Sequence, residues 1–399
     1  MMNKKQNIKE LLDGVSVEWK SLGEVAKLTR GRVMSKMYLV ENIGNYPVYS
    51  SQTANNGEIG KINTFDFDGE YVSWTTDGAN AGTVFYRKGK FSITNVCGLI
   101  KIQDNLKLNY KYLFYWLSIS AKKYVYSGMG NPKLMSNQVE KIQIPIPPLK
   151  VQSEIVKILD NFTELTAELT AELTAELTAR KKQYSYYRDT LLSFKDDEVE
   201  WKKLGDICVI GDGLHGTPKY DAKGSYYFIN GNNLNNGKII FNNKTKKVND
   251  SIFEKHGILF STGNTIFLSI NGTIGSVSFY NNEKIVLGKS VAFFNITSKK
   301  LDLRYLFYFL QTSYSKKYYE DKKTGSTIKN LGLKALRQFT IPIPPLKKQK
   351  QIVTILDKFN TLTNSISEGL PYEIELRKKQ YEYYRDMLLT FPKDSDESN

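Results

Sequence analysis

The heptapeptide Ile-Pro-Ile-Pro-Pro-Leu-Lys occupies residues 144–150 and returns unchanged at residues 341–347, which is 197 residues further along the chain. A second block, Arg-Lys-Lys-Gln-Tyr-Ser-Tyr-Tyr-Arg-Asp at 180–189, returns at the same offset with one change at 377–386. A third, Val-Glu-Trp-Lys, opens each half at 17–20 and 199–202. The chain therefore consists of two halves with the same order of elements, and the constant offset excludes an insertion after Ile144.

The body of each half, between its opening block and its proline block, has a β-rich pattern. Apolar and β-branched runs separated by Asn-, Gly- and Asp-rich turns predict strands at 70–74, 82–86, 96–102, 265–270, 276–280 and 286–296. Residues 108–124 and 303–319 have helical patterns. The bodies resemble each other much less than their flanks. An ancestral duplication with drift is one interpretation, but drift alone would blur all parts evenly. We favour a common frame that carries two diverged recognition surfaces.

A long helix is predicted after each proline block. Leu149–Phe194 contains neither Pro nor Gly, and Pro147-Pro148 stands where a helix tolerates proline. Its apolar positions recur at helical spacing: Ile155, Ile158, Leu159, Phe162, Leu165, Leu169, Leu173 and Leu177. The second half keeps this stripe at Leu362, Ile366, Leu370 and Ile374. Two matching stripes favour an antiparallel coiled coil within the chain, with packing of each helix on its own body as the alternative. Gly369-Leu370-Pro371 predicts a break in the second helix.

Composition limits the class of protein. The 399 residues include 56 Lys and Arg against 41 Asp and Glu, a formal net charge of +15, and 41% hydrophobic residues, which is enough for packed cores. A basic chain favours nucleic acid as partner. Two cysteines and two histidines exclude a zinc finger or a disulfide framework. We expect neither a membrane span nor a signal peptide, because the sequence has no long apolar run, and hence a cytoplasmic protein.

The duplicated blocks, together with the Thr-Ala-Glu-Leu repeats at 166–179, resemble the specificity subunit of type I restriction-modification systems. The stretch from Asp212 to Lys219 resembles the first loop of a target recognition domain in this family. The resemblance implies an α/β (mixed α+β) fold in which two long antiparallel helices, forming a coiled coil, separate two similar recognition domains with pseudo-two-fold symmetry. We expect recognition domains at residues 1–148 and 197–345, and conserved helical regions at 149–196 and 346–399.

The resemblance also implies a function without chemistry. A specificity subunit of this family reads a bipartite site on double-stranded DNA and scaffolds two methyltransferase subunits and the restriction motor-nuclease subunits; no cofactor or metal is implied. The residues agree with this. The Pro-Pro pairs follow Ile and precede Leu, unlike the Asn/Asp-Pro-Pro-aromatic loop that holds a flipped base, and the sequence has no phosphate-binding GxxxxGK[ST] loop. The alternatives are a self-contained DNA methyltransferase or nuclease, and a purely structural coiled-coil scaffold.

Candidate DNA-binding residues lie on polar and basic loops of both bodies. Lys and Arg contribute affinity through phosphates, and polar side chains that reach base edges contribute specificity. For each residue, a solvated loop position is the alternative. The candidates are Arg30, Arg32, Thr75, Asn80, Asn131 and Lys133 in the first half, and His215, Thr217, Lys219, Asn233, Ser269, Asn271, Thr327 and Lys329 in the second.

The near-identical helix ends are candidate docking patches for two copies of one partner, here the methyltransferase. Favourable charge near a helix C-terminus and a clamp on DNA are the alternatives. The residues concerned are Arg180, Lys181, Tyr184, Tyr187 and Arg188, and Arg377, Lys378, Tyr381, Tyr384 and Arg385.

The Thr-Ala-Glu-Leu repeats suggest a measuring element. Each four-residue repeat adds about 6 Å of helix, which corresponds to about one to two steps of B-DNA. We expect the number of repeats to set the length of the unread spacer between the two half-sites. Products of replication slippage without consequence are the alternative.

Overall fold

The structure, a computed structural model, describes residues 11–391 except residues 129 and 366. The chain forms two compact units, which we describe separately. Unit 1 comprises residues 1–170 and 376–399, and unit 2 comprises residues 171–375. Each unit thus combines one body with a part of each helical region. The predicted division into two recognition domains and two separate helical regions remains a proposal.

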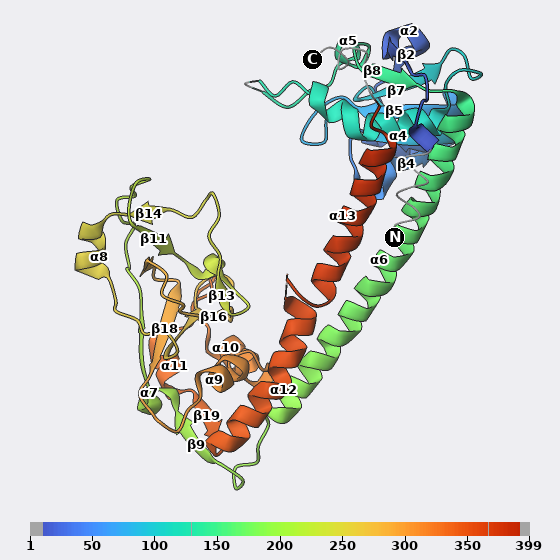
Figure 1. Ribbon diagram of the computed structural model, residues 1–399. Coiled ribbons are helices and arrows are strands. Elements are labelled where there is room, and N and C mark those ends of the chain that lie inside the picture. Colours follow the sequence, from blue (N-terminus) through green and yellow to red (C-terminus); the bar gives the residue numbers. More distant parts are fainter. Residues whose placement is uncertain (1–10, 129, 366, 392–399) are drawn as a thin grey trace, which may run out of the picture. The chain divides into compact units, whose positions relative to one another are not determined.

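Unit 1 is built around a six-stranded sheet, of which Figure 1 labels β2, β7, β5 and β4, and the strand order is β2-β7-β5-β6-β3-β4. Most neighbours are antiparallel, whereas β3 and β6 pair in parallel. The elements are β1 (Glu18–Ser21), α2 (Leu22–Val25), β2 (Ala26–Arg30), α3 (Lys36–Glu41), β3 (Ile43–Tyr49), β4 (Glu58–Ile62), β5 (Phe67–Thr75), β6 (Val84–Ile93), β7 (Cys97–Ile102), α4 (Tyr110–Ser120), α5 (Ser136–Val139), β8 (Gln143–Ile146) and the first part of α6 (Leu149–Leu191), with the last part of α13 (Leu370–Leu388).

The main core of unit 1 draws on both ends of the chain. Helix α4 packs against the sheet, and Ile155 and Leu159 of α6 join the same cluster of buried side chains. Leu388, Leu389 and Phe391, at the end of α13, complete it. The C-terminal helix is therefore a structural part of the first body.

Unit 2 divides its strands among smaller sheets, the largest being β10-β18-β15-β16. Its elements are the last part of α6, β9 (Glu200–Lys203), α7 (Leu204–Ile207), β10 (Cys208–Asp212), β11 (Tyr226–Ile229), β12 (Leu234–Asn235), β13 (Lys238–Ile239), β14 (Lys247–Val248), α8 (Asp250–His256), β15 (Thr265–Ser269), β16 (Val277–Phe279), β17 (Ile285–Leu287), β18 (Val291–Ile296), α9 (Leu303–Phe309), α10 (Ser313–Lys322), α11 (Leu333–Gln338), β19 (Thr340–Ile343), α12 (Leu346–Asn364) and the start of α13. Its core contains Tyr184 and Leu192 at the end of α6 together with Ile352 and Leu356 of α12.

The repeated sequence blocks meet in space. Strand β1 pairs with β8 and β9 pairs with β19, both antiparallel, so that Trp19 lies opposite Pro145 and Trp201 opposite Pro342. Proline is tolerated here because each pair is a separate two-stranded sheet in which one side needs no N–H partner. The tyrosines Tyr112 and Tyr305 donate hydrogen bonds to the carbonyls of Pro145 and Pro342, at 2.8 and 3.0 Å. The opening and proline blocks recur together because they form one structural element.

The helix predictions are largely confirmed. Helix α6 is continuous over 43 residues, and the second helical region breaks between Asn364 and Leu370, where Gly369 has a φ of +81°. Within the stripe, Leu165 is 47% exposed, and Ile366 lies outside the described residues.

Two predicted elements of the second body are divided in the structure. The expected helix at 303–319 is interrupted at residues 310–312, because Thr312 caps α10. The run at 286–296 forms two strands, since Gly288 begins a turn.

Among the described residues, we find no helix with the length and apolar character of a membrane-spanning segment.

Candidate nucleic-acid interface

In unit 1, two of the predicted polar loops lie together at the end of β5. The Gly78 N–H donates to the Pro132 carbonyl at 3.0 Å, and the Leu134 N–H donates to the Thr76 carbonyl at 2.9 Å. Asp77 and Lys133 form an antiparallel bridge between the loops. The structure thus brings together segments that are more than 50 residues apart in the sequence.

Arg30 ends β2 beside these loops. Its Nη2 donates to the Asn95 carbonyl at 2.9 Å and to Thr76 Oγ1 at 3.2 Å. Arg32 instead pairs with Asp66 at 3.1 Å and donates to the Tyr38 hydroxyl at 3.1 Å. We use the name corner 1 for a set of residues at this place: Arg30, Thr76, Asp77, Asn95 and Lys133.

In unit 2, the loops at the end of β15 are joined in the same way. The Gly272 N–H donates to the Lys329 carbonyl at 3.0 Å, the Leu331 N–H donates to the Ile270 carbonyl at 2.9 Å, and Asn271 bridges Asn330. Asp212 ends β10 here, and its Oδ2 lies 2.8 Å from His215 Nε2. We use the name corner 2 for the corresponding set: Asp212, His215, Asn271, Lys289 and Asn330.

Two glycines show that the backbone of corner 1 and the backbone of corner 2 have the same local arrangement. A Cβ on Gly31 would lie 2.1 Å from the Ile93 carbonyl oxygen, and a Cβ on Gly213 would lie 2.1 Å from the Leu287 carbonyl oxygen. The next residue in each unit forms a parallel β-bridge to the residue that follows that carbonyl. Arg32 bridges Thr94, and Leu214 bridges Gly288. Both positions therefore require glycine for close approach of the backbone.

The strand registers make the corners equivalent position by position. In unit 1, Arg30 of β2 and Trp74 of β5 both lie opposite Gly98 of β7. In unit 2, Asp212 of β10 and Leu268 of β15 likewise both lie opposite Ala292 of β18. It follows that Arg30 corresponds to Asp212 and that Asn95 corresponds to Lys289. The bridges match Asp77 with Asn271 and Lys133 with Asn330. Asp212 and Lys289 were not among the DNA-binding candidates chosen from the sequence, although Asp212 opens the stretch that resembles a recognition-domain loop. Their correspondences rest on β-register, and the surrounding sequences differ.

Corner 2 contains a hollow of about 450 Å³. Its polar lining offers one carboxylate, one imidazole, one amine and two amides, and the complete lining is Asp212, His215, Ile270, Asn271, Lys289, Asn330, Leu331, Gly332 and Leu333. Such a mixture of donors and acceptors suits the polar edges of bases, since each base presents a distinct pattern of both.

Three predicted DNA-binding residues support loops instead. Thr75 and Ser269 are fully buried, and their hydroxyls accept hydrogen bonds from the N–H groups of Thr83 and Ser276. Asn233 is 5% exposed and its amide donates to the Ile240 carbonyl at 2.9 Å. Direct contact with DNA is not available to these buried side chains, so we correct their predicted role to loop support.

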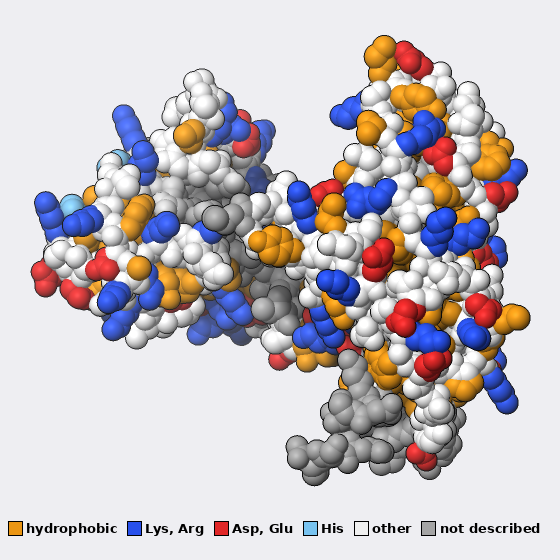
Figure 2. Space-filling model, turned by 90° about the horizontal axis from the view of Figure 1, so that it is seen from above, with side chains coloured by type: hydrophobic (Ala, Val, Ile, Leu, Met, Phe, Trp, Pro, Cys, Tyr) orange, Lys and Arg blue, Asp and Glu red, His pale blue; other side chains and the backbone are white. Residues whose placement is uncertain are grey.

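The other predicted residues are accessible. Within corner 1 and its loops, Asn80, Asn131 and Lys133 are exposed, and Lys329 and Thr327 are exposed beside corner 2. Thr217 and Lys219 lie on the exposed loop that follows His215. Figure 2 shows Lys and Arg side chains spread over the visible face of both bodies, with Asp and Glu between them.

A further loop beside corner 1 was not predicted from the sequence. Ser50 accepts a hydrogen bond from Thr94 at 2.9 Å, and the exposed residues 52–56 follow it. Asn55 and Asn56 have left-handed φ values of 49° and 52°. Beneath lies Arg87, 2% exposed, with two guanidinium nitrogens that have no partner among the described residues. Burial lowers the pKa of Arg87 to about 10.

The helix-end residues predicted to dock partners fall into two groups. Tyr184 and Arg188 are buried, so they stabilise unit 2. Tyr187 and Tyr384 stack on Phe359 and Phe162, and Tyr381 contacts Thr163 at 3.2 Å. Local partners hold the arginines: Arg180 pairs with Glu176, Arg377 with Gln380 and Arg385 with Asp386.

Lysine and tyrosine side chains are accessible at each helix end. Lys181 and Lys378 are exposed, and the nearby Tyr186 and Tyr383 are 67% and 51% exposed. These residues occupy equivalent positions in the two repeats. Because Tyr184 and Arg188 are buried, the exposed residues are the better candidates for a docking surface.

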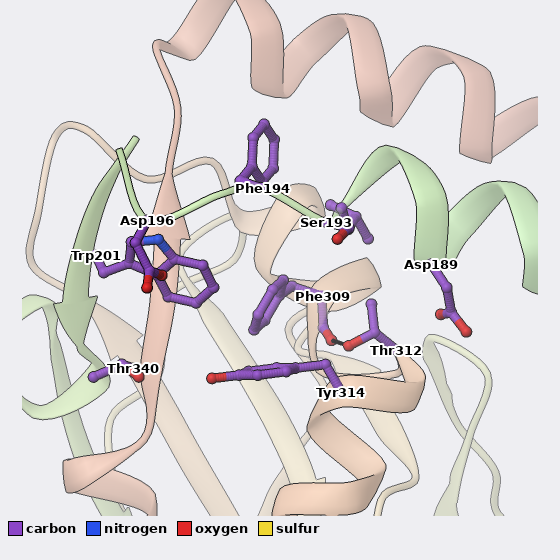
Figure 3. A pocket seen from close by; sticks show the side chains of 10 residues that line it. Asp189, Ser193, Phe194, Asp196, Trp201, Phe309, Thr312, Tyr314 and Thr340 are labelled. Atoms are coloured by element: carbon purple, nitrogen blue, oxygen red, sulfur yellow. Dashed lines mark hydrogen bonds between the residues drawn. The ribbon is translucent and has the colours of Figure 1, made fainter. Parts of the chain in front are cut away.

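A second hollow of about 450 Å³ lies in unit 2 where α6 ends (Figure 3). Asp189 accepts hydrogen bonds from the N–H and hydroxyl of Ser313, and Thr312 donates to the Phe309 carbonyl, so these polar groups are already satisfied. The Trp201 indole N–H has no partner among the described residues. The hollow joins the end of α6 to α10.

Among the described residues, no group of three or more His, Cys, Asp or Glu side chains could hold a metal ion. Cys97 and Cys208 are buried, and burial raises the pKa of each thiol to about 12.

Known proteins show the same organisation. The model of the type I restriction modification DNA specificity domain matches twice, at residues 15–179 and 196–376. The Escherichia coli type I restriction enzyme EcoR124I/EcoR124II specificity subunit is 35% identical over 100% of both chains. A type I specificity subunit of Mycoplasma pneumoniae is 39% identical over 84% of this chain and 97% of its own.

Solved structures agree in fold. A chain solved in a study of assembly and conformational transition of the type I R-M system has a TM-score of 0.65 at 17% identity, covering 95% of this chain and 98% of that one. The HsdS subunit from Thermoanaerobacter tengcongensis has a TM-score of 0.50 at 16% identity, covering 93% and 95%.

Proposed function

Because the chain belongs to the type I restriction-modification DNA specificity family, we propose that it reads a two-part site on double-stranded DNA, one part with each unit. The chain is the DNA sequence-recognition subunit of such a system and is not itself the enzyme. Its proposed contacts with DNA are the accessible side chains of the two corners and of the loops beside them.

The equivalence of the two corners is the observation that supports this proposal. Each corner has the same backbone frame, with a glycine that packs against a carbonyl and two loops joined by matching hydrogen bonds. The side chains at equivalent positions nevertheless differ, as with Arg30 and Asp212. A shared frame with different side chains is suited to reading two different half-sites, because base edges are distinguished by side-chain donors and acceptors.

We further propose that the exposed helix ends around Lys181 and Lys378 dock two methyltransferase subunits, and that restriction motor-nuclease subunits join the complex. Equal patches suit two copies of one partner. The study that solved the similar structure concerns assembly of a type I complex, which supports this proposal by analogy.

The test is a map of methylated bases in cells that carry this chain with the methyltransferase of its system. We expect one motif with two specified parts and an unspecified spacer of fixed length. Deletion of the gene for this chain should abolish the modification. A contiguous motif, or modification that persists without the chain, would contradict the proposal. Purified chain that transfers methyl groups alone would favour a self-contained enzyme.

A further inference from the structure

Corner 1 and corner 2 differ most at the position that ends β2 in one unit and β10 in the other. Arg30 occupies it in unit 1 and Asp212 in unit 2, so the charge is reversed. At the equivalent positions beside them, Asn95 is replaced by Lys289 and Asp77 by Asn271. The donors and acceptors at matching places therefore differ between the corners, and they are reversed at the position of Arg30 and Asp212.

Asp212 retains an acceptor for a ligand. Its Oδ2 lies 2.8 Å from His215 Nε2, whereas its Oδ1 accepts no hydrogen bond from the described residues. The side chain of Asp212 is 18% exposed and that of His215 is 71% exposed, and both line the hollow of corner 2. The carboxylate is thus held by one oxygen while the other is available at the hollow.

The negative charge of Asp212 favours contact with a base edge over contact with a phosphate. A carboxylate repels phosphates and adds nothing to the electrostatic attraction that holds proteins on DNA. It does accept a hydrogen bond from an exocyclic amino group, as on cytosine N4. Arg30 has the opposite chemistry, since a guanidinium donates to the acceptors of guanine, O6 and N7.

We propose that this shared position reads a base in each half-site, with opposite polarity. This inference rests on the proposed function. Arg30 selects a guanine in the half-site of unit 1. Asp212, oriented by His215, selects a base that presents an amino group, cytosine or adenine, in the half-site of unit 2. The position is a specificity determinant, and Asp212 was not among the DNA-binding residues predicted from the sequence, although it opens the stretch that resembles a recognition-domain loop.

The experiment selects binding sites from randomised double-stranded DNA with the full chain in complex with its methyltransferase subunits. In Asp212→Asn the side chain keeps its size but one acceptor becomes a donor. We expect its preference to change by about tenfold at one position of one half-site, with the other half-site and the spacer unchanged. Arg30→Gln should alter one position in the other half-site.

Two further variants separate base reading from general effects. His215→Ala, at an exposed side chain, should weaken preference at the same base as Asp212→Asn. Glu254→Gln, an exposed residue of α8, changes the net charge equally and should leave the motif unaltered.

The inference is overturned if Asp212→Asn tightens binding to all sequences without changing the motif, if it changes nothing, or if it and Arg30→Gln alter the same half-site. A wild-type complex that selects no two-part motif rejects the proposed function, and this inference with it. A wild-type two-part motif that Asp212→Asn leaves intact rejects the inference alone.

Discussion

The Phe162 ring stacks on the Tyr384 ring, with centroids 5.3 Å apart and planes 19° from parallel. Their counterparts in the repeat, Phe359 and Tyr187, stack at 5.4 Å within unit 2. In each unit, a phenylalanine near the start of one helical region thus meets a tyrosine near the end of the other. This exchange requires antiparallel helices in both units.

The first prediction concerns Leu388, which is fully buried in the core of unit 1 although it stands near the C-terminus of the chain. Leu388→Ala should destabilise unit 1 by about 2–5 kcal/mol, because it leaves a cavity in a packed core. Hydrogen exchange should become faster in α4 and in the first part of α6.

The matched variant is Leu356→Ala, at a fully buried position in the core of unit 2. It should speed exchange in α9 and leave α4 unchanged. If Leu388→Ala instead loosened α9 and left α4 protected, the assignment of the C-terminal helix to the core of unit 1 would be wrong.

The second prediction concerns two buried glutamines at the start of the long helices. Gln152 accepts from the Asn109 N–H at 2.9 Å and donates to the carbonyls of Lys107 and Pro147, both at 2.8 Å. Gln349 makes the same three bonds, to Asp302, Lys300 and Pro344. Each side chain thus ties the turn before a helix of the body to a proline block.

Gln152→Leu should reduce the free energy of unfolding by about 3 kcal/mol or more, because three buried backbone groups lose their partner. Gln349→Leu should cost a similar amount in unit 2. Denaturant unfolding, with hydrogen exchange to locate the change, measures both. The control is Gln143→Leu, which removes a partly exposed amide that donates to the Lys141 carbonyl at 3.5 Å, two residues away. It should change the free energy of unfolding little. Equal effects of all three variants would contradict the explanation.

The sequence predicts the parts of this fold that depend on local pattern. The long helix α6, the break near Gly369 and the pairing of the two halves follow from proline, glycine and 3.6-residue periodicity, which act over a few residues. The sequence does not predict which body the end of each long helix packs against. Packing on its own body or on the body of the other half would bury the same apolar stripe.

The candidate interface was only partly predictable. The choice of polar loops selected Lys133, which is exposed, and Arg30, which is partly exposed. The same rule selected Thr75 and Ser269, whose hydroxyls turn inward and accept hydrogen bonds from backbone N–H groups. Short polar side chains commonly serve loops in this way. Asp212 opens the stretch that resembles a recognition-domain loop, but it was not chosen as a DNA-binding residue, because its equivalence to Arg30 rests on strand register, which a single sequence does not contain.

The third prediction concerns alkaline pH. Burial raises the pKa of Tyr184 to about 12 and also raises the pKa values of Tyr115, Tyr305 and Tyr308. In the unfolded chain, tyrosine titrates near pH 10. The stabilisation is therefore complete below about pH 10 and is lost as pH rises through the folded pKa values, because the unfolded state then releases protons first. The lowered pKa of Arg87 has the opposite effect on stability, because the folded state releases that proton first, but Arg87 is a single group.

Urea unfolding at about pH 9 and about pH 11 measures the effect. The midpoint should fall between the two. Tyr184→Phe should lessen this fall and cost little at neutral pH, since the Tyr184 hydroxyl has no hydrogen-bond partner among the described residues. A wild-type midpoint that rises with pH would contradict the assignment.

The fourth prediction concerns docking. Lys181→Glu and Lys378→Glu reverse the charge of exposed residues at equivalent helix ends, so each should weaken one methyltransferase site by about tenfold. Mass measurement of the complex should find one methyltransferase subunit bound to either single variant and none to the double variant. The buried control Tyr184→Phe should bind two. Loss of both subunits from a single variant would contradict two separate, equal sites.

The last prediction concerns the Thr-Ala-Glu-Leu repeats, which lie within the continuous helix α6. Deletion of residues 170–173 should shorten this helix by about 6 Å and the preferred DNA spacer by about one to two base pairs. Both half-sites should be unchanged, since the corners lie in the bodies. Replacement of the same four residues by another helix-forming tetrapeptide keeps the length and should keep the spacer. Mapping of methylated sites decides the matter: altered half-sites with the original spacer, or a shifted spacer in the replacement, would show that helix length does not measure the distance between half-sites.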